Sequence, residues 1–143
     1  HYDIVFISGG WGAAYDLAQT SAMAEKVSEA FYGERTAVIG GVCHGVLGLI
    51  NAKDKEGNTL IAGRRMTGVT DKQIRELGIE MTPLHPESEL RRVGALFESQ
   101  TAFRDLFATH VVVDDEQRFV TGQNQNSGLE TAHRMMQVIA DRG

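Results

Sequence analysis

The chain has 143 residues, of which 42% are hydrophobic, and this composition is typical of one globular domain and not of a disordered chain. Its formal net charge of −5 argues against general binding to nucleic acids or to a membrane surface, and no apolar run approaches the roughly 18 residues of a membrane span. A single cysteine rules out an intrachain disulfide framework and favours the reducing cytoplasm.

The sequence opens within two residues on an apolar strand, Tyr2 to Ile7. Because a domain rarely starts inside its own core, we expect the single domain of residues 1–143 to lack an N-terminal strand-helix segment. A glycine-rich loop, residues 8–12, follows at the carboxyl end of the strand, where open α/β sheets bind ligands. We expect this loop either to supply a backbone N–H group to an oxyanion, from Gly10, or to be only a tight turn.

The stretch from Thr36 to Ala52 is predicted to be a buried strand that runs into a helix, with Cys43 at the corner. The cysteine lies in the sequence G-V-C-H-G, and a nucleophile elbow needs small residues two positions before and after the nucleophile. At a helix N-terminus, the pKa of the thiol is expected to fall from about 8.5 into the range of about 3.5 to 7.5. The N–H group of His44 would then point toward an oxyanion. The alternative interpretation is a free cysteine that is buried as a small hydrophobe.

The other elements are assigned from caps, turns and hydrophobic periods. They are a helix that begins at Thr20 or Ser21 and ends at Gly33, an extended segment from Leu60 to Val69, a helix from Asp71 to Leu77 capped by Thr70 and ended by Gly78, a helix from Glu87 to Val93, a strand at 95–98, and a hairpin of 110–114 with 118–121. Arg64 and Arg65 are expected to be a solvated pair, with binding of an anionic substrate as the alternative. Phe103, Leu106 and Phe107 form an apolar cluster. We expect it to belong to the core, to a dimer surface or to a wall of the substrate pocket.

The last helix has the clearest sequence signals. Ser127 and Glu130 have the S-x-x-E spacing of a capping box. The apolar stripe of this helix is predicted to consist of Leu129, Ala132, Met136, Ile139 and Ala140. The polar loop before it, residues 122–126, is expected to face the cysteine.

The order of these motifs resembles the DJ-1/PfpI superfamily, which has the class I glutamine amidotransferase-like fold. The matching stretches, spread over essentially all 143 residues, are the GGWG loop, the GVCHG elbow, TGVT, GALFES and VTGQNQNSG before the last helix. The resemblance implies an α/β fold, a flavodoxin-like three-layer sandwich with a mostly parallel sheet and helices on both faces. Within the superfamily, the Cys-His-Gly elbow is most similar to the heat-shock chaperones and glutathione-independent glyoxalases (glyoxalase III). His44 directly after Cys43 argues against glutamine hydrolysis, because amidotransferases keep their histidine far down the chain.

The resemblance also implies roles for individual residues. Cys43 would be the nucleophile, His44 its acid/base and an oxyanion N–H donor, and Gly10 the second N–H donor. A glutamate that contacts the cysteine in the family would lie before His1. Some relatives have an acidic residue at the position of Ile74, where it completes a triad. That acid is replaced here only if the short helix turns one of two carboxylates inward: Asp71 or Glu76.

The implied chemistry is attack of the Cys43 thiolate on a small reactive aldehyde such as methylglyoxal, without glutathione. The hemithioacetal becomes a thioester, and hydrolysis gives a hydroxy acid, lactate in the case of methylglyoxal. No metal or organic cofactor is expected, since the histidines at positions 1, 44, 85, 110 and 133 lack metal-ligand spacing. A homodimer is also expected.

Two other functions remain open from the sequence. A thiolate beside an oxyanion hole also suits acyl transfer, so the second hypothesis is an amidase or peptidase of the same fold. The third is a non-enzymatic stress chaperone or redox sensor, in which Cys43 is oxidised and exposed apolar surface binds client proteins.

Overall fold

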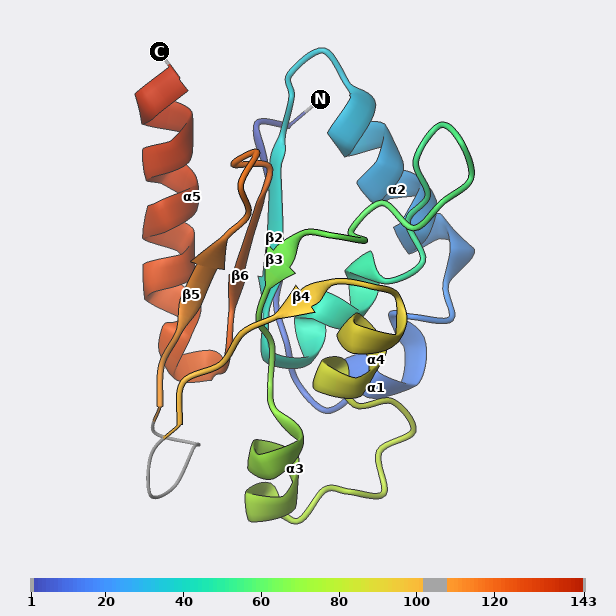
Figure 1. Ribbon diagram of the computed structural model, residues 1–143, viewed down its shortest axis with the longest axis vertical. Coiled ribbons are helices and arrows are strands. Elements are labelled where there is room, and N and C mark those ends of the chain that lie inside the picture. The colour runs from blue at the N-terminus through green and yellow to red at the C-terminus, as the bar shows by residue number, and fades with distance from the viewer. Residues whose placement is uncertain (1, 102–107, 143) are drawn as a thin grey trace.

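A four-stranded sheet organises the computed structural model, which describes residues 2–101 and 108–142 (Figure 1). The strand order is β1-β2-β6-β5, with bounds Ile4–Ile7 (β1), Val38–Val42 (β2), Phe119–Gly122 (β6) and Val111–Val113 (β5). β1, β2 and β6 are parallel, whereas β5 runs antiparallel to β6. The predictions of a mostly parallel sheet and of a late hairpin are therefore confirmed.

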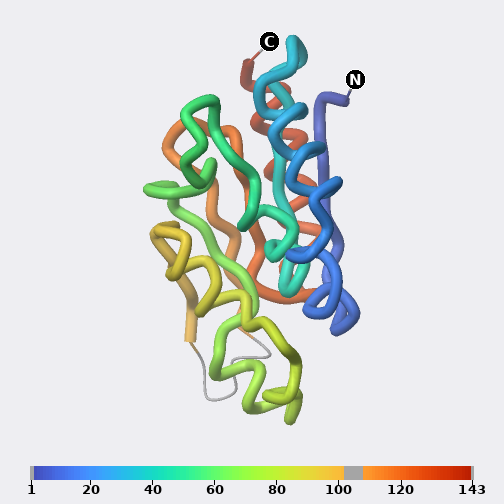
Figure 2. Tube along the Cα trace, turned by 90° about the vertical axis from the view of Figure 1, so that its right-hand side faces the viewer, coloured from blue at the N-terminus to red at the C-terminus, as the bar shows by residue number. Residues whose placement is uncertain are grey.

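Helices cover both faces of this sheet, as Figures 1 and 2 show. Val38 on β2 packs with Val120, Met135 and Val138 on the side of α5, whereas the next residue, Ile39, belongs to the larger core on the opposite side. This alternation is what a strand buried on both faces requires. The helices are α1 (Ala13–Asp16), α2 (Ser21–Tyr32), α3 (Asp71–Leu77), α4 (Pro86–Arg92) and α5 (Gly128–Arg142), with 3-10 helices η1 (Cys43–Leu49) and η3 (Gln125–Ser127). The predicted α/β three-layer architecture is confirmed.

Close contact between β2 and β6 depends on Gly40. A Cβ atom at this position would lie 1.7 Å from the Val120 carbonyl oxygen and 3.2 Å from the terminal methyl group of Met135. Only a glycine leaves room for both neighbours. Gly40 thus allows β2 to pack closely against β6 and α5, three residues before Cys43.

The α3 helix has the predicted bounds, because its two ends have strong local signals. The Thr70 hydroxyl accepts a hydrogen bond from the Gln73 N–H group, and the Gln73 side chain accepts one from the Thr70 N–H group. At the other end Gly78 adopts a left-handed conformation with φ 70°. The neighbouring α4 helix begins and ends one residue earlier than predicted.

The segment Leu60 to Val69 is extended over a much shorter length than predicted. Its strand, β3, comprises only Arg65–Met66 and pairs in parallel with β4, Leu96–Phe97, in a separate two-stranded sheet. Residues 60–63 form turns, with Gly63 at φ 76°. The apolar residues of this segment face the core without forming a ladder, so hydrophobicity alone overestimated the strand.

Arg64 is not part of a solvated pair, so that prediction is wrong. Its side chain is 14% exposed and contacts Asp114 Oδ2 at 2.6 Å and Glu116 Oε1 at 3.1 Å. The guanidinium also stacks over the rings of Phe31 and Phe119. Arg64 therefore joins the hairpin turn to the main core. Arg65 is more exposed and pairs with Glu98.

The apolar stripe of α5 is displaced by one residue from the predicted one. Leu129 and Met136 are 71% and 53% exposed, whereas Thr131, Met135 and Val138 are buried. The Ser127 hydroxyl accepts from the His110 N–H group and donates to Asn124 Oδ1. The predicted apolar cluster of Phe103, Leu106 and Phe107 lies outside the described residues. Among the described helices, none is long and apolar enough to cross a bilayer.

Candidate active site

The sharp turn after β2 has the geometry of a nucleophile elbow. Val42 is still extended, at φ −128°, and Cys43 then adopts φ 57°, a left-handed conformation that is costly for a residue with a side chain. A Cβ atom at Gly41 would lie 2.9 Å from the Ile7 carbonyl oxygen, and one at Gly45 would lie 2.3 Å from the same atom. Both flanking positions therefore need glycine, which is the pattern that the sequence predicted.

The helix that follows the corner is a 3-10 helix and not the expected α-helix. Residues 43–49 form η1, and its residues after Cys43 are all buried. A short 3-10 turn aligns fewer peptide dipoles than a long α-helix does. The electrostatic support that a helix N-terminus was expected to give the thiol is accordingly weaker.

Cys43 and His44 form the reactive pair. The Cys43 Sγ atom lies 3.5 Å from His44 Nδ1, and the His44 side chain is fully buried. Burial lowers the pKa of His44, and the nearby His85 lowers it further. The lowered pKa favours a neutral His44 ring, and its Nδ1 lies within reach of the thiol proton. Its other ring nitrogen, Nε2, is buried without a hydrogen-bond partner among the described residues.

The Cys43 thiol does not have the low pKa that was expected from its place at the corner. Burial raises the pKa of Cys43, and a hydrogen bond from the backbone of His44 offsets this only in part. The half-buried side chain packs against an apolar cluster of Val69, Ile74 and Ile79. The thiol therefore needs a base to take its proton when it reacts, and His44 Nδ1 is within reach.

The position where the family resemblance suggested an acidic residue, Ile74, is apolar and buried in the structure. Ile74 is fully buried in the cluster that packs against Cys43. Of the two carboxylates suggested as replacements, Asp71 lies near His85 and accepts from the Ser88 hydroxyl. Glu76 pairs with Lys72 along the same helix. None of these contacts is made to Cys43 or His44, and a catalytic role for either carboxylate stays a prediction.

The glycine-rich loop passes directly beside the elbow. A Cβ atom at Gly9 would lie 3.0 Å from the Cys43 Cβ and 3.3 Å from the His44 nitrogen. Gly10 follows with φ 123°, a conformation that favours glycine, and a Cβ atom there would meet nothing within 4 Å. The structure thus assigns the close approach to Gly9, which the sequence did not single out, while the oxyanion role of Gly10 stays a prediction.

The side chains of the polar loop after β6 form hydrogen bonds to neighbouring segments of the chain. Gln123 donates to the carbonyl oxygens of Gln100 and Ala108, and Asn124 donates to the same Ala108 oxygen. Both side chains are buried. These bonds fix the chain around residues 100 and 108, so the loop has a structural task beside the orientation toward Cys43 that the sequence suggested.

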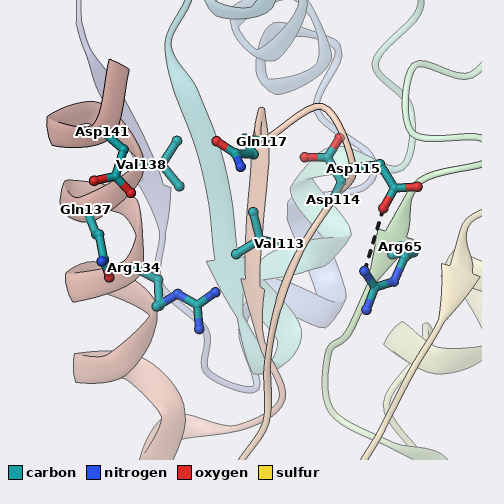
Figure 3. A pocket seen from close by; sticks show the side chains of 9 residues that line it. All are labelled: Arg65, Val113, Asp114, Asp115, Gln117, Arg134, Gln137, Val138 and Asp141. Carbon is teal, nitrogen blue, oxygen red and sulfur yellow. Dashed lines mark ion pairs between the residues drawn. The ribbon is translucent and has the colours of Figure 1, made fainter. Parts of the chain in front are cut away.

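No described cluster of three or more His, Cys, Asp or Glu side chains could hold a metal ion within residues 2–101 and 108–142. A depression of about 530 Å³ lies between α5 and the β5–β6 hairpin, where Arg134, Gln137 and Asp141 face Asp115 and Arg65 (Figure 3). It includes neither Cys43 nor His44, and its lining contains both positive and negative side chains. We therefore take the elbow, and not this depression, as the candidate active site.

Comparisons with known proteins agree with this choice. No protein-family model matches the chain. The sequence is 31% identical to glyoxalase 3 of Candida albicans over 92% of this chain. It is 30% identical over 96% of this chain to a protein of Schizosaccharomyces pombe named as a putative glutathione-independent glyoxalase. In structure, 96% of the chain superposes on 57% of the crystal structure of glyoxalase III from Candida albicans, with a TM-score of 0.80 and 27% identity.

The chain spans about half the length of the curated relatives that it matches, 55% in each of these two cases. Within that half lie the strand, the loop, the elbow and the final helix on which the motif resemblance was based. The sequence and structural similarities confirm that resemblance: this chain is similar to the glyoxalase III branch of the DJ-1/PfpI superfamily.

Proposed function

We propose that this chain carries the nucleophilic centre of a glyoxalase III-type enzyme, which converts methylglyoxal to lactate without glutathione or another cofactor. The observation that carries the proposal is Cys43 held at φ 57°, with its Sγ atom 3.5 Å from His44 Nδ1. A strained residue between two sterically required glycines is typical of a site where geometry serves chemistry. The relatives named as glyoxalases support the choice of substrate class.

The first step is addition of the thiol to the aldehyde carbon of methylglyoxal. The Cys43 Sγ–C bond forms as the aldehyde C=O π bond opens and the Sγ proton passes to His44 Nδ1; His44 then returns that proton to the aldehyde oxygen, which completes the hemithioacetal and restores the neutral base. The N–H group of His44 lies at the corner to stabilise the developing oxyanion, with Gly10 as the proposed second donor.

The remaining steps move a proton and release the product. A base removes the hydrogen from the carbon bonded to sulfur while the ketone oxygen takes a proton, which gives an enediol. The neighbouring carbon then receives a proton and the hydroxyl group on the sulfur-bearing carbon loses its own, which converts the hemithioacetal into a lactoyl thioester. Water then cleaves the thioester, so that lactate leaves and the thiol is restored. The net reaction adds one water to methylglyoxal and consumes no oxidant or reductant. His44 Nδ1 lies 3.5 Å from the thiol and is the base that we propose for these transfers.

Because the pKa of Cys43 is raised, we propose that His44 acts as the base that takes the thiol proton. Because burial keeps the thiol protonated, the reaction depends on a base that is itself neutral. Burial lowers the pKa of His44 and so maintains that neutral state. An aldehyde is a suitable electrophile for such a pair, since addition and proton transfer can occur together.

The direct test measures methylglyoxal loss and lactate formation by the full chain. Cys43→Ala should lower kcat/KM by at least about 10³-fold, because it removes the nucleophile. His133→Ala, at an exposed position on α5, serves as the control and should keep wild-type activity. If Cys43→Ala keeps full turnover, the nucleophile assignment is wrong. If the wild-type chain hydrolyses amides or peptides and leaves methylglyoxal unchanged, the acyl-transfer hypothesis replaces this one.

The proposal also concerns compartment and assembly. We place the enzyme in the reducing cytoplasm, because its one cysteine is free and is required as a thiol. A homodimer is the assembly expected from the family resemblance. Sedimentation velocity of the purified chain measures it directly.

A further inference from the structure

The outer side of β1 is an open edge of the main sheet. Within residues 2–101 and 108–142, the strand order is β1-β2-β6-β5, so β1 pairs with β2 alone. Figure 2 shows β1 at the border of the molecule, as the dark blue trace that leads down from the N-terminus. An open edge presents backbone N–H and C=O groups that are ready to pair with another strand. One more strand would therefore extend the sheet at this place.

The flank of α5 next to this edge is apolar. Arg134 and Met136 come directly before and after the buried Met135, and at 3.6 residues per turn they lie on opposite flanks of the helix. Arg134 lines the depression beside the β5–β6 hairpin, at the other end of the sheet (Figure 3). Met136 therefore lies on the flank toward β1. This β1-side flank of α5 carries the stripe that the sequence predicted: Leu129, Ala132, Met136, Ile139 and Ala140.

Apolar side chains remain uncovered on both faces of the sheet beside β1. On the α5 face, Leu129 and Met136 are 71% and 53% exposed, and Phe6 on β1 is 39% exposed. Ile4, two residues before Phe6, packs in the cluster under α5, and residues two apart on a strand share a face. On the opposite face, a groove of about 390 Å³ lies between β1 and α2 and includes Val5 in its lining. Exposed apolar patches of this kind mark surfaces that another polypeptide covers.

The lengths of the relatives indicate what covers this surface. The chain superposes on 57% of the glyoxalase III structure from Candida albicans, which leaves 43% of that structure unmatched. The strand-helix segment that the sequence led us to expect contains the two parts that the surface requires. Its strand offers backbone groups to β1, and its helix offers an apolar face to the β1-side flank of α5. A second copy of this chain is the other occupant that the surface admits.

We propose that the open edge of β1 and the β1-side flank of α5 form the docking surface of a strand-helix segment of the same protein, outside residues 1–143. The strand of that segment pairs with β1 and extends the sheet. The apolar face of its helix covers Leu129 and Met136 and removes them from water. The proposal concerns assembly alone, so it does not depend on the glyoxalase activity.

The variants for the test are neighbours on α5. Met136→Glu places a charge on the proposed docking surface, whereas Gln137→Glu places the same charge on the opposite flank, beside the depression. Both positions are exposed, and glutamate is a good helix former, so both variants should fold as the wild type does. Thermal melts followed by circular dichroism check this.

The first arm is sedimentation velocity of the full chain alone, which distinguishes the segment from a second copy. If the chain dimerises, as the family resemblance leads us to expect, Met136→Glu should leave the dimer intact. A wild-type dimer that Met136→Glu abolishes and Gln137→Glu preserves would mean that a second copy occupies the surface. That result overturns the proposal.

The second arm uses as its probe the part of Candida albicans glyoxalase III on which the chain does not superpose, expressed with a tag beside the full chain. The two polypeptides should purify as a one-to-one complex, in which the β1 amides exchange hydrogen more slowly than in the chain alone. Met136→Glu should weaken the complex by at least about tenfold, because it buries a charge without a partner, and Gln137→Glu should not. Absence of a wild-type complex, or a complex that Met136→Glu leaves unchanged, overturns the proposal.

Discussion

The elbow and the β5–β6 hairpin both bury polar side chains, but only the hairpin gives its buried side chain a full set of hydrogen-bond partners among the described residues. In the hairpin, Asp114 is 2% exposed, and its carboxylate accepts from the N–H groups of Arg118 and Phe119 and from the Arg64 guanidinium. In the elbow, His44 is equally buried and leaves Nε2 without a described partner. The hairpin thus satisfies its buried charge, whereas the elbow retains an unmet hydrogen bond and a strained backbone beside the nucleophile. Costs of this kind are tolerated where they serve function.

Gly45→Ala should disrupt the elbow most strongly. The new Cβ atom would lie 2.3 Å from the Ile7 carbonyl oxygen and 2.8 Å from that of Ser8, and backbone atoms cannot move aside as a flexible side chain can. We expect the free energy of unfolding to fall by about 3–4 kcal/mol in a urea titration. Gly12→Ala is the matched control, because its Cβ atom meets nothing within 4 Å and its φ is −56°. Equal stability of the two variants would contradict the elbow geometry.

Asp114→Asn tests the hairpin side of the comparison. The substitution leaves the Arg64 guanidinium, 14% exposed, without its closest carboxylate and replaces one acceptor by a donor. We expect a loss of about 3 kcal/mol in the free energy of unfolding. Asp115→Asn, at a side chain that is 85% exposed and 3.6 Å from Arg65, should cost less than about 0.5 kcal/mol.

The two regions should also separate stability from reactivity. Asp114→Asn should leave the rate of Cys43 alkylation in the folded protein unchanged, because the hairpin carboxylate does not contact the elbow. A large change in that rate would mean that the two regions are coupled.

Sequence reasoning succeeded where a short stretch of chain contains its own structural cause. The G-V-C-H-G corner was predicted because two small residues must flank a tight turn, and the contacts of Gly41 and Gly45 confirm that need. The bounds of α3 followed from the Thr70 cap and Gly78. The hairpin followed from two β-branched runs around a polar turn. In each case the deciding residues lie within a few positions of one another.

The buried stripe of α5 shows where local reasoning fails. Two neighbouring sets of residues have helical spacing, one with Met136 and one with Met135, and propensity does not choose between them. The choice is made by Gly40 on β2, whose missing side chain leaves room for the Met135 methyl group. That contact joins residues 95 positions apart, and no pattern within the helix reports it.

A pair of methionine variants tests this account. Met135→Ala removes a fully buried side chain that packs with Val38 and Val120, so the free energy of unfolding should fall by about 2 kcal/mol. Met136→Ala changes a side chain that is 53% exposed and should alter it by less than about 0.5 kcal/mol. Similar losses for the two variants in urea unfolding would contradict the burial of Met135 alone, and a larger loss for Met136→Ala would support the stripe predicted from the sequence.

Two electrostatic features were beyond sequence reasoning for the same reason. Arg64 was expected in solvent, because its carboxylate partner Asp114 lies 50 positions away. The thiol of Cys43 was expected to ionise at neutral pH, because a helix N-terminus lowers a cysteine pKa in general. Its burial against side chains from 69 to 79 reverses the direction. Burial comes from tertiary packing, and the local motif does not encode it.

The smallest expected effect is the pH dependence that Cys43 gives to stability. Its pKa is raised in the folded chain, so the unfolded chain loses the thiol proton first, near pH 8.5. The contribution of the neutral thiol is therefore complete below about pH 8.5 and is lost as pH rises through the folded pKa. The difference in free energy of unfolding between the wild type and Cys43→Ser should shrink or reverse between about pH 8 and pH 10.

Iodoacetamide should likewise react more slowly with native Cys43 than with the urea-unfolded chain at pH 8. A native alkylation midpoint below about pH 7 would instead mean that the dipole of the corner outweighs burial, and the thiol would then need no proton acceptor from His44.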